Sequence, residues 1–147
     1  MKRSILLILI ILVTVTASFA QRIAPYKVTA IKILPFDEPT GKFEDEAKGN
    51  ERGFFNDLDT SVLAVVEITG TPGKFASKRD LSVRVTQGRK VMISRIAQVG
   101  IPGDDGKYFV PIWINSPICD PVTITATVTG QTTRATMTRK LDAHCGE

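Results

Sequence analysis

Histidine and cysteine are scarce in this 147-residue sequence, which contains one histidine and two cysteines. A single histidine excludes the zinc motif HExxH, and the chain also lacks the G-x-S-x-G elbow, the P-loop and a G-x-G-x-x-G turn that opens a helix. We therefore expect no enzyme activity and no cofactor. The alternative is a small hydrolase that uses loop carboxylates, with Glu38 and either Asp57 or Asp59 as acid and base.

An excess of positive charge is also lacking once the N-terminus is set aside. Lys2 and Arg3 are two of the 19 basic residues, which leaves 17 basic against 15 acidic residues, a net charge of +2. A nucleic-acid interface needs Lys and Arg concentrated on one face or in one segment. We therefore expect no nucleic-acid partner.

The one long hydrophobic run lies at the N-terminus. A basic pair at positions 2–3 precedes apolar residues 5–15, interrupted only by Thr14, and a small-x-small ending at 18–20. This pattern predicts a secretory signal peptide, residues 1–20, with cleavage after Ala20. An uncleaved anchor is the alternative, although the uncharged stretch falls short of the ~20 apolar residues of a spanning helix. Gln21, rather than Cys, follows the cut, so we expect a periplasmic or secreted protein without lipid anchor or stable membrane insertion.

Strand-forming residues dominate the rest of the chain. From Val122 to Val128, apolar residues alternate with Thr, a period of two that fits a strand and not a helix. A tight turn at Gly130–Gln131 is expected to reverse the chain into a second strand that ends near Leu141. Arg139 shares the parity of the inward-facing residues there, which predicts a bulge or an exposed strand end.

Five further segments have strand character. The apolar segment Ser61–Thr69 is expected to be a central strand buried on both sides. Pro111 places the segment Gly106–Ile114 at a sheet edge or a bulge. The others are Tyr26–Phe36 and a hairpin formed by Asp80–Thr86 and Lys90–Val99. About seven short strands without an amphipathic helix predict one all-β domain, residues 21–147, built as a two-sheet antiparallel sandwich, with a small closed barrel as the alternative.

The strand count, the Thr-alternating hairpin and the segments SPICDPVTITATV and AHCGE resemble an immunoglobulin-like or fibronectin-III-like β-sandwich. The chain is similar to small exported bacterial proteins of unknown function that consist of one such module. It departs from the antibody pattern because both cysteines lie in the last quarter and Trp113 precedes them. The resemblance therefore implies a fold and no antibody or receptor function.

The two cysteines, Cys119 and Cys145, are expected to form a disulfide, because an even pair in an exported chain is oxidised by default. A turn at Gly130–Gln131 places the partner of Cys119 near position 142, within reach of Cys145 after one bulge. A metal or nucleophilic site at His144 and Cys145 would need a free thiolate, which a disulfide removes.

The segment from Phe36 to Ser61 is longer than the usual connection between strands, and long loops in compact domains commonly carry function. We expect the binding residues there: Asp37, Glu38, Phe54, Phe55, Asp57 and Asp59. A calcium site is the alternative, with oxygen ligands from Asn56, Asp57 and Asp59 and from Asp104 and Asp105 of a second loop.

Taken together, these features predict a non-catalytic, exported binding or structural module without a metal, which contacts a protein or a cell-surface polymer. A calcium-dependent ligand-binding domain belongs with the hydrolase as the alternative. A subunit or chaperone of surface fibres would need an unpaired edge strand, which Pro111 and charged edge residues disfavour.

Overall fold

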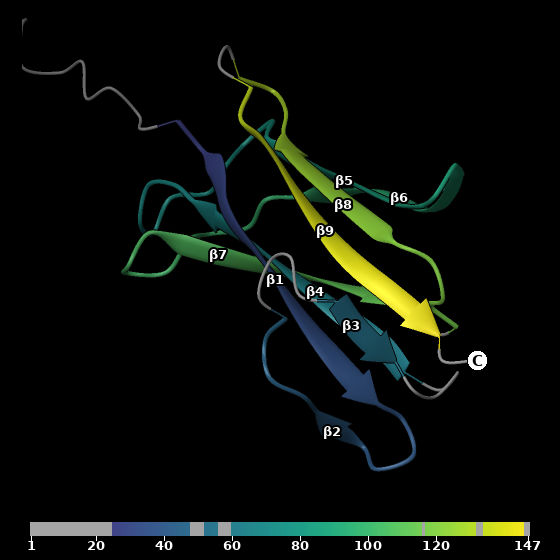
Figure 1. Ribbon diagram of the computed structural model, residues 1–147. Coiled ribbons are helices and arrows are strands. Elements are labelled where there is room, and N and C mark those ends of the chain that lie inside the picture. The colour runs from purple at the N-terminus through teal and green to yellow at the C-terminus, as the bar shows by residue number, and fades with distance from the viewer. Residues whose placement is uncertain (1–24, 48–51, 56–59, 116, 132–133, 146–147) are drawn as a thin grey trace, which may run out of the picture.

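The computed structural model describes residues 25–47, 52–55, 60–115, 117–131 and 134–145, with backbone pairing alone for 52–55 and 145 (Figure 1). Every regular element in this part of the chain is a strand. It therefore contains no helix long and apolar enough to cross a membrane.

Within the described residues, nine strands form two sheets that face each other (Figure 1). The four-stranded sheet has the order β2-β1-β4-β7, and the five-stranded sheet has the order β3-β9-β8-β5-β6. All pairs are antiparallel except β3 with β9, which is parallel. The strands are β1 (Lys27–Asp37), β2 (Lys42–Phe43), β3 (Arg52–Phe55), β4 (Thr60–Thr69), β5 (Asp80–Gln87), β6 (Lys90–Gln98), β7 (Lys107–Ile114), β8 (Val122–Val128) and β9 (Thr136–Cys145).

The core lies between the sheets and follows the period of two in the sequence. Alternate residues of each inner strand are fully buried, while their neighbours point outward. Representative inward residues are Ile33 of β1, Val66 of β4, Val83 of β5, Ile112 of β7 and Ile124 of β8. The two-sheet sandwich expected from the sequence is therefore confirmed.

The predicted positions of several strands are confirmed as well. β5 and β6 form a hairpin that turns at Gly88, whose φ of 54° lies in the region that glycine favours. β7, which contains Pro111, lies at an edge of its sheet, where a missing N–H donor leaves the ladder intact. β4 is a central strand, as expected. The prediction that it is buried on both sides is wrong, since Leu63 and Val65 on its outer face are only half-buried.

The predicted tight turn at Gly130–Gln131 is wrong. The β8–β9 ladder ends at the pair Thr127 with Thr136, so a longer connection joins the strands. The connection is held from outside the hairpin, because the side chain of Gln131 both accepts a hydrogen bond from the backbone N–H of Tyr26 and donates one to its carbonyl. These two hydrogen bonds connect the start of β1 to the β8–β9 connection of the five-stranded sheet.

The predicted bulge or exposed end at Arg139 is also wrong. The ladder runs without a register shift from Val122 with Leu141 to Thr127 with Thr136, and Arg139 pairs with Ile124 in it. Its half-buried side chain keeps the inward parity, and Nη2 donates a 2.6 Å hydrogen bond to the carbonyl of Ala47. The half-buried guanidinium is tolerated there because the carbonyl of Ala47 accepts one of its hydrogen bonds.

The long segment expected to be a loop contains two short strands. β2 pairs with β1 through Phe36 with Phe43, and β3 pairs with β9 through Phe54 with His144. The segment thus runs from an edge of one sheet to an edge of the other, with Ala47 bonded to both Ile33 and Arg139 on the way. Its backbone satisfies groups that the two edge strands would otherwise leave unpaired.

Candidate functional site

Much of the outer face of the four-stranded sheet is apolar across three strands, although Lys32, Glu67 and Lys107 also lie on it. Because Val62, Ala64 and Val66 of β4 face the core, the residues between them face outward, and the register aligns outward residues of β1 and β7 beside them. We call the resulting surface the aromatic face; its residues are Leu34, Phe36, Phe43, Leu63, Val65, Phe109, Pro111 and Trp113.

Three aromatic rings form a cluster at the end of this face next to β2. Phe36 lies 5.0 Å from Phe43 and 5.6 Å from Trp113 between ring centroids, and the Phe36–Trp113 pair is edge-to-face. Phe43 and Trp113 are 6.0 Å apart. These distances lie in the range in which aromatic pairs attract one another, so the cluster holds its own shape.

The cluster is packed but remains accessible. Phe43 is 50% exposed and Trp113 47% exposed, and further along β7 Phe109 is 48% exposed. A monomeric antiparallel sheet with one face in the core normally places polar residues on the other face. Exposed apolar surface on such a face is a feature that proteins commonly show at interaction sites.

In the five-stranded sheet, the outer face over β8 and β9 is polar, while Ile96 of the edge strand β6 is an exposed apolar residue beside Ser82. Thr125 faces Thr138 with 3.3 Å between hydroxyl oxygens, and Thr127 faces Thr136 with 2.8 Å. Arg84 is exposed on the neighbouring strand, opposite Thr125. The outer surface over β8 and β9 therefore differs in chemistry from the aromatic face, although both belong to one sandwich.

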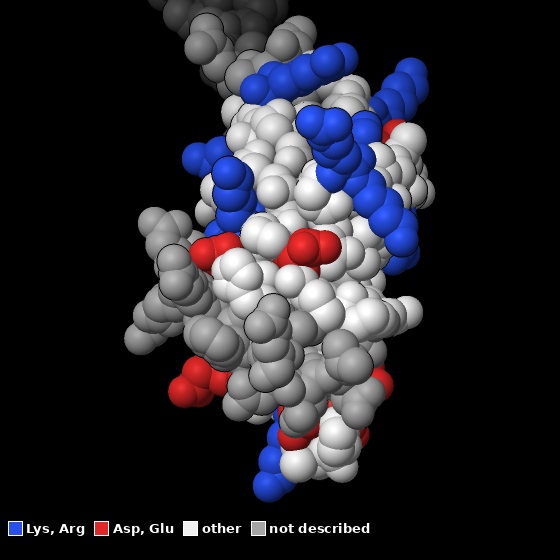
Figure 2. All heavy atoms as spheres, turned by 45° about the vertical axis from the view of Figure 1, so that its right-hand side comes forward, with Lys and Arg blue, Asp and Glu red and all other residues white. Residues whose placement is uncertain are grey.

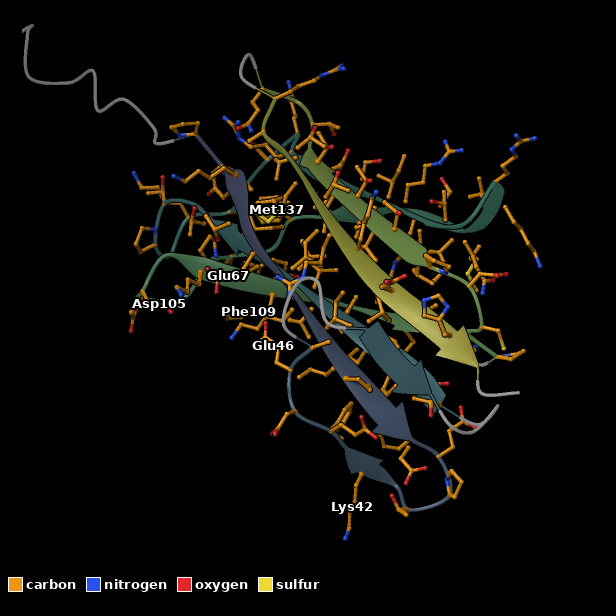
Figure 3. All side chains as sticks on the ribbon, in the orientation of Figure 1. Lys42, Glu46, Glu67, Asp105, Phe109 and Met137 are labelled. Atoms are coloured by element: carbon orange, nitrogen blue, oxygen red, sulfur yellow. The ribbon has the colours of Figure 1, made fainter. Side chains whose placement is uncertain are left out.

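Away from the cluster, a buried carboxylate borders the aromatic face. Glu67 pairs with Phe109 across the ladder and is 9% exposed. Its Oε1 accepts a 2.8 Å hydrogen bond from the hydroxyl of Thr29, and its Oε2 lies 3.2 Å from Nζ of Lys107. Figure 3 labels Glu67 and Phe109 on the side chains of this region. The Thr29 bond, followed by Lys107 and the charge of Lys32, lowers the pKa of Glu67, against an opposing effect of burial.

Two of the binding residues expected from the sequence lie beside the aromatic cluster. Asp37 ends β1 and accepts a hydrogen bond from the hydroxyl of Thr40, and Glu38 accepts one from the hydroxyl of Ser61. Both carboxylates thus help to hold the β1–β2 connection next to Phe36.

The remaining expected binding residues are placed only in part. The backbones of Phe54 and Phe55 pair with β9 at His144 and Cys145. Their side chains, together with Asn56, Asp57 and Asp59, lie outside the described residues.

The second loop of the calcium hypothesis shows turn geometry. Asp105 Oδ1 accepts a 3.0 Å hydrogen bond from the backbone N–H of Lys107, and Asp104 is exposed. Across the described part of the chain, no group of three or more His, Cys, Asp or Glu residues is arranged to hold a metal ion.

At the end of β9, His144 makes a surface contact. Its Nε2 lies 3.2 Å from Oδ1 of Asp142, and both side chains are almost half exposed. Cys119, in the connection before β8, is not a free thiol, whereas the side chain of Cys145 lies outside the described residues.

Sequence reasoning missed the aromatic face. The signal was the segment KYFVPIWI, in which both parities of an edge strand are apolar apart from Lys107. In an edge strand with one face in the core, apolar residues should alternate with polar ones. Phe109 and Trp113 occupy positions where polar residues are expected, so they indicated an apolar outer face. No protein-family model matches this chain, and no curated protein matches it.

Proposed function

We propose that this protein is a non-catalytic, exported binding or structural module that contacts a protein or a cell-surface polymer through the aromatic face. The observation that carries the proposal is the half-exposed state of Phe43, Phe109 and Trp113 on one contiguous sheet surface. Aromatic side chains of this kind supply large contact area at low entropic cost and dominate the energy of many interfaces.

The proposal is tested by photo-crosslinking in the cells that produce the protein. p-Benzoylphenylalanine replaces Trp113 in one variant and Thr125, on the Thr-rich outer face of the other sheet, in a control variant. Irradiation should yield one dominant adduct from position 113 and none from position 125, because only the first surface is apolar. The same adducts from both positions, or none from position 113, would contradict the proposal.

The finer fold assignment is an immunoglobulin-like sandwich of the fibronectin-III type. It is supported by the strand order: β1, β4 and β7 correspond to strands A, B and E of that architecture, and β9, β8 and β5 to strands G, F and C. β6 extends the second sheet beside β5, as an additional C-side strand does. Fold analogy alone carries no function.

We also propose that Cys119 and Cys145 form a disulfide in the exported protein. The register supports it: because Val122 pairs with Leu141, continuing the antiparallel pairing backward brings Cys119 opposite His144, one residue from Cys145. The bond would tie the end of β9 to the connection before β8, and closing such a loop adds about 3 kcal/mol of stability in the chain-entropy model.

Intact mass of the exported protein without reductant tests both the bond and the cleavage after Ala20. We expect a chain that begins at Gln21, two hydrogens lighter than the reduced form and inert to a thiol-alkylating reagent. After reduction, two alkyl groups should be added. A mass that retains residues 1–20 would refute the cleavage after Ala20. Two thiols that react without reduction would refute the disulfide.

A further inference from the structure

We infer that the partner of the aromatic face is a protein segment in which apolar side chains alternate with Lys or Arg. The inference rests on the proposed function and selects one partner class from it. Its basis is the charge around the aromatic cluster. At the end of the sheet that holds β2, this charge is predominantly negative.

The connection around β2 carries most of this charge. Between Asp37 and Glu46 there are five carboxylates and one basic residue, Lys42. Asp37 and Glu38 hold the connection through their hydrogen bonds. Glu38 is exposed, and so are Glu44, Asp45 and Glu46.

Glu44, Asp45 and Glu46 lie along β1, at the border of the aromatic face. The backbone N–H of Glu44 donates a 2.9 Å hydrogen bond to the carbonyl of Pro35, and that of Ala47 donates one of the same length to Ile33. Residues 44–47 therefore follow the edge of β1 beside Leu34 and Phe36, which belong to the aromatic face. We call Glu44, Asp45 and Glu46 the acidic border.

Positive charge gathers toward the other end of the molecule. On the side shown in Figure 2, most Lys and Arg lie in the upper part, whereas Asp and Glu lie mainly in the middle and lower parts. The lower part is the end that holds β2 in Figure 1. Two basic residues lie on the same outer face but further from the cluster, Lys32 beyond Leu34 on β1 and Lys107 beyond Phe109 on β7. Both act on Glu67.

A partner that joins apolar and basic side chains fits this arrangement in two ways. Its apolar side chains would cover Phe43 and Trp113, while its Lys or Arg groups meet the acidic border within the range of unscreened attraction. A cation placed over the exposed ring of Trp113 would gain a further cation–π interaction. An acidic segment would meet repulsion at the same position, so the surface selects for charge as well as for apolar area.

The chain provides its own reporter for this interaction, because Trp113 is its only tryptophan. The probe is a short peptide of alternating Leu and Lys, titrated into the protein expressed from the full chain while tryptophan emission is recorded. A peptide of alternating Leu and Glu serves as the matched control. We expect the Leu-Lys peptide to shift the emission to shorter wavelength and the Leu-Glu peptide to leave it unchanged, with affinity falling about tenfold at high salt.

Charge reversal locates the interaction. The double variant Glu44→Lys with Glu46→Lys should bind the Leu-Lys peptide about tenfold more weakly. Asp104→Lys should leave binding unchanged, because Asp104 lies in the turn before β7, at the opposite end of that strand from Trp113 and its aromatic cluster. Unchanged thermal melting of each variant confirms that the fold is retained.

The outcomes separate this inference from the proposed function. Absence of a shift with the Leu-Lys peptide, or an equal shift with the Leu-Glu peptide, overturns the choice of a basic partner. If a neutral soluble polysaccharide instead shifts the emission of Trp113, the aromatic face is still a binding surface, but for a polymer. Absence of a cross-link from position 113 removes the proposed function itself.

Discussion

Among the carboxylates of the described residues, Glu67 is the one whose pKa departs clearly from its ordinary value. It lies on the outer face of a sheet, yet it is buried between Thr29 and Lys107, which bond its two carboxylate oxygens. The hydroxyl and the ammonium favour the ionised form over the protonated one, and this preference lowers the pKa of Glu67 below its ordinary value of 4.5.

The lowered pKa of Glu67 predicts the pH dependence of stability. Because folding lowers the pKa, the contribution is present above pH 4.5 and is lost as the pH falls through the lowered folded-state pKa. At pH 7, Glu67→Gln should reduce the free energy of unfolding by about 1 kcal/mol, and this difference should shrink in acid.

Urea unfolding of the two proteins between pH 7 and pH 3 measures the difference. Glu46→Gln, which removes an exposed carboxylate of the acidic border, is the control and should follow the unsubstituted protein across the range. A constant difference between Glu67→Gln and the unsubstituted protein at every pH would show that the carboxylate is not preferentially ionised in the folded state.

Among the elements, the short strands β2 and β3 were not predicted from the sequence, yet each of them covers the edge of a longer strand. Both belong to the connection between β1 and β4, and each covers one exposed strand edge, β2 that of β1 and β3 that of β9. Arg139 adds a bond from β9 to Ala47 in the same connection. Uncovered edges present unpaired N–H and C=O groups to other chains.

Replacement of residues 38–59 by a short Gly-Ser linker should therefore leave the two main ladders folded but cause self-association. The edges of β1 and β9 would become free to pair with a second copy. Light scattering after size-exclusion chromatography should show oligomers whose fraction rises with protein concentration. The matched control replaces the β6–β7 turn at Asp104 and Asp105 by Gly-Ser and keeps the edge strands covered. A monomeric linker variant would mean that the connection has no role in edge protection.

At the scale of the whole molecule, the two sheets share one core but present different surfaces. The Thr-rich face of β8 and β9 is polar, and the aromatic face of β1, β4 and β7 is apolar with an acidic border. A single small domain thus combines a solvated side with a side suited to contact. This asymmetry is the observation on which the proposed binding function rests.

Much of the fold could be predicted from the sequence because strand formation is a local property. The alternation from Val122 to Val128, the hairpin at Gly88 and the edge position of Pro111 follow from side-chain parity, positive φ and a missing N–H donor, which act within a few residues. Asp37 and Glu38 were expected in a long connecting segment because its length was visible, and they lie in that segment next to Phe36.

Only the tertiary structure decided which apolar face lies in the core and which meets solvent. The segments Ser61–Thr69 and Lys107–Ile114 are apolar on both parities, so their sequences fit either a strand covered on both sides or one exposed on one side. The pairing of β1 with β4 and β7 brought Phe36, Phe43 and Trp113 together from three separate segments. Such proximity depends on contacts between residues distant in the chain, and local sequence carries no information about them.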